Sequence, residues 1–216
     1  MPRLGIYTYD FRFYHEAIEI LKVWKIPFMS LERPDVAPPD VVAILSKPED
    51  AVVPDIKVAA ADPLMAVRRS IPRLLDKAEF ENLVIGIDPG PYPGIAVFGD
   101  GILIEAYECP TLDRVRGDIK SILLSYSYRN SVIKIGNGDM PNRKLIMDSI
   151  KGLGTRIFIV DEKNTSFPHK IHDNALSAAR IANVRVQNTP EEGKRDRGGR
   201  KTAIEREFLT IRKVLS

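Results

Sequence analysis

Cysteine and long apolar runs are scarce or missing in this chain of 216 residues, and its first 80 residues contain no glycine-rich phosphate loop. Cys109 is the only cysteine, which excludes an internal disulfide and favours a reducing cytoplasmic location. Every apolar run stops well short of the roughly 18 residues that a membrane span needs, so we expect no membrane partner. The opening residues, MPRLGIYTYD, reach a charge too early for a signal peptide.

Charge is balanced over most of the chain and positive only near its end. Residues 185–216 hold 9 Lys and Arg against 5 Asp and Glu, whereas residues 81–184 hold 12 of each. A polyanion would therefore meet the C-terminal segment first, although a solvated terminal helix explains the same excess equally well. Five basic residues lie in its polar part and could grip phosphates without reading sequence: Lys194, Arg195, Arg197, Arg200 and Lys201.

The first 80 residues alternate strand-like and helical patterns. Helical periodicity covers Phe11–Ile26 and Leu64–Lys77. Short apolar runs supply the expected strands, at Arg3–Tyr9, Pro27–Leu31, Val41–Leu45 and Ile56–Ala60. We therefore predict a small α/β domain over residues 1–80, with a partly parallel sheet and a role that the sequence does not indicate. The aromatic cluster near its start is expected to be core rather than a base-stacking platform.

Residues 81–185 follow a different order. Three strand-like runs come first, joined by short turns, and then helix, strand, helix, strand and helix alternate. This order resembles the ribonuclease H-like fold, in which helices flank a five-stranded mixed sheet. Residues 186–216 are predicted to be a charged flexible segment followed by a C-terminal helix, with helical periodicity over Lys201–Leu215.

Acidic residues stand at element ends throughout residues 81–185. Asp88 closes the first strand, Asp139 follows a later strand through Gly-Asn-Gly, Asp161 and Glu162 end the last strand, and Asp173 lies in the first turn of the last helix. Each has an ordinary structural explanation as a turn, cap or helix-dipole residue. Sites in open α/β sheets, however, gather at the carboxyl ends of strands. Converging carboxylates need a cation, and oxygen ligands favour Mg²⁺ or Mn²⁺.

Four motifs in this region resemble the RuvC/YqgF branch of the ribonuclease H-like superfamily, and their order along the chain is that of the branch. The stretch at 134–139 is similar to the Ile-Gly-Asn-Gly of YqgF-like domains in the transcription accessory protein Tex. The motifs are GIDPGPYPGIAV (86–97), KIGNGD (134–139), VDEKNTS (160–166) and HDNALSAARIA (172–182).

The resemblance implies metal-dependent cleavage of branched DNA, as in recombination and repair, or of RNA. It implies that Asp88, Glu162 and Asp173 are catalytic metal ligands; Asp139 has no firm counterpart and is a fourth candidate. Lys134 stands where RuvC proteins carry an acid on the fourth strand.

Three functions stay open at this point. The first is an Mg²⁺- or Mn²⁺-dependent endonuclease acting on structured DNA or RNA; two metal ions can activate water and stabilise the leaving oxygen. The second is a catalytically inactive nucleic-acid-binding or scaffold protein on the same fold. The third, an actin-like phosphotransferase, normally needs a longer chain with two such domains. A homodimer is also open.

Overall fold

The computed structural model of this chain describes residues 1–52, 55–161, 173–184 and 207–215. Contacts divide the chain into two compact units. The first unit comprises residues 1–80, 121–127 and 212–216, and the second comprises residues 81–120 and 128–211.

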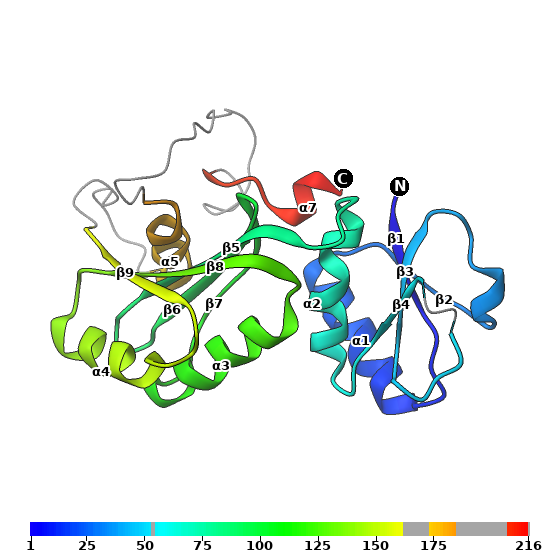
Figure 1. Cartoon of the computed structure of the whole chain (residues 1–216), viewed down its shortest axis with the longest axis horizontal. Coiled ribbons are helices and arrows are strands. Elements are labelled where there is room, and N and C mark those ends of the chain that lie inside the picture. The colour runs from blue at the N-terminus through cyan, green and yellow to red at the C-terminus, as the bar shows by residue number, and fades with distance from the viewer. Residues whose placement is uncertain (53–54, 162–172, 185–206, 216) are drawn as a thin grey trace. The chain divides into compact units, whose positions relative to one another are not determined.

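The first unit contains a parallel sheet of four strands, in the order β2-β1-β3-β4. This order matches the first four strands of a common doubly wound α/β arrangement, 2-1-3-4-5. Two long helices lie on one face of the sheet, and α1 packs on α2 (Figure 1). The elements are β1 (Arg3–Ile6), α1 (Phe11–Trp24), β2 (Phe28–Ser30), the short helix η1 (Pro34–Val36), β3 (Val41–Ser46), β4 (Lys57–Ala59) and α2 (Pro63–Leu74).

Capping interactions define where both helices begin and where α1 ends. Asp10 and Asp62 cap α1 and α2, because each carboxylate accepts the backbone N–H three residues later. Helix α1 ends before the predicted Ile26, since Lys25 adopts a left-handed conformation (φ 56°) and its N–H returns to the last turn.

The aromatic cluster of the first unit is only partly core. Phe13 is buried and shares the inner face of α1 with Ala17 and Leu21, at spacings of four residues. Tyr9 and Phe11, in contrast, are 82% and 80% exposed. The expectation that the cluster is core is therefore wrong for these two rings, because they precede the periodic face of the helix.

The second unit contains a mixed sheet of five strands, in the order β7-β6-β5-β8-β9. Strands β5, β6 and β7 form an antiparallel meander, and β8 and β9 are parallel. The elements from here on are β5 (Phe80–Asp88), β6 (Gly94–Gly99), β7 (Ile102–Glu108), α3 (Leu112–Ser125), β8 (Tyr128–Gly136), α4 (Met140–Ile150), β9 (Arg156–Val160), α5 (Asn174–Asn183) and α7 (Ile211–Val214). Residue 80 of β5, residues 121–125 of α3 and residues 212–214 of α7 are counted with the first unit. The predicted fold class, a five-stranded mixed sheet flanked by helices after a small α/β domain, is confirmed.

The neighbouring strands β5 and β8 run in the same direction. The N–H of Phe80 donates to the carbonyl of Ser127, and the amide of Asn130 donates to the carbonyl of Glu81. Both bonds join the beginnings of the two strands, so their carboxyl ends also lie at one edge. Because β8 and β9 pair in parallel, with Gly136 opposite Val160, the end of β9 lies at the same edge.

Helices cover both faces of this sheet: α3 and α4 lie on one face and α5 on the other (Figure 1). Helix α5 packs on β6, β7 and β8. Small residues on both sides allow its close approach: the core on this face includes Ala96, Ala178 and Ala182. A side chain at Gly86 would lie 2.1 Å from the carbonyl oxygen of Ala178. Glycine is therefore required at position 86, because α5 leaves no room for a side chain there.

The C-terminal residues of the second unit pair with β7 and α5. The N–H of Leu103 donates to the carbonyl of Leu209, and Arg180 forms an ion pair of 2.9 Å with Glu207. Of the helix predicted over Lys201–Leu215, residues 211–214 are helical, and residues 201–206 lie outside the described part. Among the described residues, no helix has the length and apolar character to cross a bilayer.

Candidate active site

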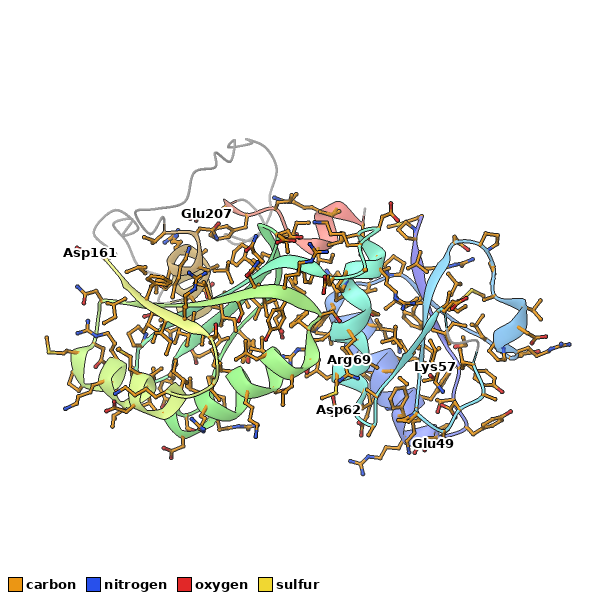
Figure 2. All side chains as sticks on the ribbon, viewed as in Figure 1. Glu49, Lys57, Asp62, Arg69, Asp161 and Glu207 are labelled. Atoms are coloured by element: carbon orange, nitrogen blue, oxygen red, sulfur yellow. The ribbon has the colours of Figure 1, made fainter. Side chains whose placement is uncertain are left out.

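The described acids at the strand ends lie along the carboxyl edge of the second sheet. Asp88 is the last residue of β5, and Asp161 follows β9 directly. Figure 2 shows Asp161 at the tip of β9, where its side chain is exposed. Strand β8, which lies between β5 and β9, ends at the same edge. The expectation that these strand ends converge is therefore confirmed by the sheet itself.

The side chain of Asp88 faces helix α5. Asp88 pairs with Gly94 on β6, and Gly94 pairs with Glu108 on β7. Residues directly opposite one another in antiparallel strands point to the same face. A side chain at Gly94 would lie 1.8 Å from the carbonyl oxygen of Asn174. The row Asp88–Gly94–Glu108 therefore lies beneath the N-terminus of α5.

Asp173 caps the same helix end. Its carboxylate accepts the backbone N–H of Leu176 at 2.9 Å, so it is the N-cap of α5 rather than a residue of the first turn. Because Asn174 lies on Gly94, which is opposite Asp88, the structure brings Asp173 to the end of the sheet that holds Asp88.

Asn174 joins three segments at this end. Its side-chain amide donates to the carbonyl of Tyr92 at 2.8 Å and to Glu108 at 2.6 Å. The N–H of Cys109 donates to the carbonyl of Pro93 at 2.7 Å. The turn between β5 and β6 is thereby held from both sides, by the first residue of α5 and by the residue after β7.

Asp139 has a structural role at the same edge. It caps α4 and holds both the backbone N–H and the side-chain amide of Asn142. Arg143 is the positively charged residue in the first turn of the same helix, α4. Its guanidinium donates to the backbone and side-chain oxygens of Asn137, just beyond β8. Asp139 is exposed, has φ 24° and lies in the turn between β8 and α4.

Several predicted site residues lie outside the described part of the chain. They are Glu162 and the basic residues Lys194, Arg195, Arg197, Arg200 and Lys201. Within the described ranges, no group of three acidic, His or Cys residues is close enough to hold a metal ion.

Lys134 replaces the acid that the resemblance would place on β8. Its ammonium donates to the carbonyls of Ala182 at 2.6 Å and Val184 at 2.8 Å, at the C-terminal end of α5. Such carbonyls have no partner within a helix, and a cation there complements the helix dipole. Burial lowers the pKa of Lys134. Asn174 and Lys134 together fix the two ends of α5 on the sheet.

A second candidate site lies in the first unit, where a cavity of about 360 Å³ opens at the carboxyl ends of β1 and β3. Its lining residues are Asp10, Arg12, Phe13, Glu16, Lys47, Ala61, Asp62 and Pro63. Figure 2 shows Asp62 and the nearby Glu49 at one end of this sheet. A hydrogen bond from Lys47 lowers the pKa of Asp10, and both Asp10 and Glu49 lie within 3.1 Å of the Lys47 ammonium. The charged groups of this cavity largely neutralise one another.

Comparison with protein families finds a similarity in the first unit. Residues 3–74 match the model of a response regulator receiver-like domain. The match covers a third of the chain and agrees with the parallel sheet of that unit. No curated protein matches the chain.

Sequence reasoning missed two residues at the edge of the second sheet. Glu108 and Asn174 are joined across 66 residues of sequence. The pattern contained one signal, the glycine at position 94, since a glycine in an apolar strand often marks a close approach of another backbone. Nothing in the sequence, however, indicated which backbone approaches it.

Proposed function

We propose that the second unit is an Mg²⁺- or Mn²⁺-dependent nuclease domain of the RuvC/YqgF type, hydrolysing phosphodiester bonds in structured DNA or in RNA. The observation that carries this proposal is the position of Asp88 and Asp173 at one end of the sheet, beneath and at the N-terminus of α5. The packing of α5 alone would hold both acids at this end of the sheet. Their negative charges repel one another there unless a cation offsets the repulsion.

The donor set suits a hard divalent ion. Asp88 and Asp173, together with Glu162, are the residues that would hold it through carboxylate oxygens. A divalent ion held there would supply an activated water and stabilisation of the leaving oxygen of a phosphodiester. The chain itself positions the two acids: β5 delivers Asp88, and the contacts of Asn174 and Lys134 fix the helix that delivers Asp173.

The test uses substitutions that retain the caps. Asn replaces Asp at an N-cap with little loss of stability, so Asp173→Asn removes the charge and keeps the helix end. Asp62→Asn is the matched control, since Asp62 caps α2 in the first unit with the same bond. Labelled junction, flap, duplex and RNA substrates are incubated with Mn²⁺ and each protein.

The proposal expects cleavage by the wild type and by Asp62→Asn, at similar rates. It expects a loss of at least about a hundredfold in Asp88→Asn and Asp173→Asn, since each removes a metal ligand. Cleavage that persists in these two variants, or an inactive wild type, would overturn it.

A second candidate function is a catalytically silent nucleic-acid-binding protein. Two observations favour it: Lys134 occupies the place of an acid, and the described acids alone do not form a metal group. This candidate expects nucleic-acid binding that is unchanged in Asp88→Asn, with no cleavage by any of the proteins.

A further inference from the structure

The aromatic side chains of the second unit are mostly covered, and Tyr92 is the exception within the described residues. Its side chain is 56% exposed, whereas the other Phe and Tyr residues of that unit are buried or half-buried. Tyr92 lies in the turn between β5 and β6, two residues before Gly94. It therefore stands just before the start of β6, beside the end of β5 where Asp88 lies.

The turn that carries this ring is held rigidly from two sides. The carbonyl of Tyr92 accepts the side-chain amide of Asn174, and the carbonyl of Pro93 accepts the N–H of Cys109. An exposed ring on a fixed backbone loses little conformational freedom when a flat ligand stacks on it.

A hydrogen-bonded cation lies near the end of β8, the strand on the other side of β5. The guanidinium of Arg143 is anchored on the oxygens of Asn137, which follows β8. Strands β6 and β8 flank β5, so the turn that carries Tyr92 and the residue that anchors Arg143 both lie at the edge of the sheet where β5 ends. The ring offers an aromatic face for a base, and the guanidinium offers a planar donor for a phosphate.

We infer that Tyr92 stacks on an unpaired nucleobase of the substrate, while Arg143 contacts its phosphate backbone. This deepens and rests on the proposed function: the substrate of the Asp88 edge is a single strand, or an unpaired segment within a structured nucleic acid. A base inside a duplex cannot present its face to a side chain, whereas an unpaired base can.

The test is an oligonucleotide of fifteen nucleotides carrying one 2-aminopurine, whose fluorescence is quenched by stacking. It is titrated as a single strand and as a duplex, with Ca²⁺ in place of Mn²⁺. Five proteins are compared: the wild type, Tyr92→Ala, Tyr92→Phe, Arg143→Ala and Phe11→Ala. Phe11 is the control, because it is a similarly exposed ring in the first unit.

We expect tighter binding of the single strand than of the duplex by the wild type, with quenching. Tyr92→Ala weakens the binding by about 5- to 100-fold and removes the quenching, since one stacked base is lost. Tyr92→Phe and Phe11→Ala retain both. Arg143→Ala weakens binding and reduces its dependence on salt.

Equal binding by Tyr92→Ala and the wild type, or an equal loss in Phe11→Ala, overturns the inference. So does a duplex that binds as tightly as the single strand. Parallel cleavage assays with Mn²⁺ separate the two proposals. If the wild type cleaves and Tyr92→Ala has no effect on binding or quenching, the nuclease proposal stands and the stacking role is refuted. If Tyr92 quenches the probe but the wild type does not cleave, the stacking role stands and the nuclease proposal is refuted. A wild type that binds neither form overturns the inference.

Discussion

Replacing Gly94 by Ala tests the contact on which the geometry of the site depends. The added carbon would lie 1.8 Å from the carbonyl oxygen of Asn174 and 2.3 Å from its carbonyl carbon. Both atoms belong to the backbone of α5, so no side-chain rotation relieves the overlap. Either the helix end moves off the sheet or the strand bends, and overpacking of this kind costs roughly 1–3 kcal/mol, or more where the backbone must shift.

The matched control is Gly117→Ala, within α3. Nothing lies within 4 Å of the carbon that this change adds. Alanine is favoured over glycine inside a helix by about 0.8–1.0 kcal/mol, so this variant should be as stable as the wild type or slightly more stable. The assay is urea unfolding of each full-length protein, followed by circular dichroism. A Gly94→Ala variant within about 0.5 kcal/mol of the wild type, which is typical of uncrowded surface sites, would show that α5 does not lie on Gly94.

Three further predictions concern the ends of α5, the buried thiol and the basic segment. Lys134→Met should lower the stability by about 1 kcal/mol, because the carbonyls at the end of α5 lose their donor. Burial lowers the pKa of Lys134 below 10.5, so the folded protein releases this proton before the unfolded chain does. The stability of the wild type relative to Lys134→Met should therefore rise with pH between that lowered pKa and 10.5, as measured by urea unfolding at several pH values; a flat or falling difference contradicts the assignment. Burial raises the pKa of the Cys109 thiol, so its reaction with a thiol reagent should be slow in the native protein and fast in urea; rapid native labelling refutes this. Deleting residues 186–201 should weaken nucleic-acid binding and reduce its salt dependence in filter-binding titrations; an unchanged salt dependence removes the role of Lys194 and its basic neighbours.

Much of the second unit could be predicted because its signals are local. Apolar alternation located the strands, and the acids at their ends were expected at one edge because parallel strands end together. The cap role of Asp139 was among the readings that the sequence allowed, since Asp before a helix commonly accepts the N–H three residues later. These inferences need only residues near one another along the chain.

The features that could not be predicted from the sequence depend on contacts between residues that are far apart along the chain. Lys134 reaches carbonyls 48 and 50 residues away, and Asn174 reaches Tyr92 and Glu108 from 82 and 66 residues away. Periodicity cannot show which side chain meets which helix end. The exposure of Tyr9 and Phe11 was also mispredicted, because an aromatic run before a helix looks the same whether its rings turn inward or outward.

The most direct test of the account is the position of a bound metal ion. Crystals of the protein soaked in MnCl₂ would be measured at a wavelength where manganese scatters anomalously. The account predicts a manganese peak between the carboxylates of Asp88 and Asp173 at the N-terminus of α5, absent from crystals of Asp173→Asn. A peak bound only elsewhere, or no peak at this edge under saturating Mn²⁺, would contradict it.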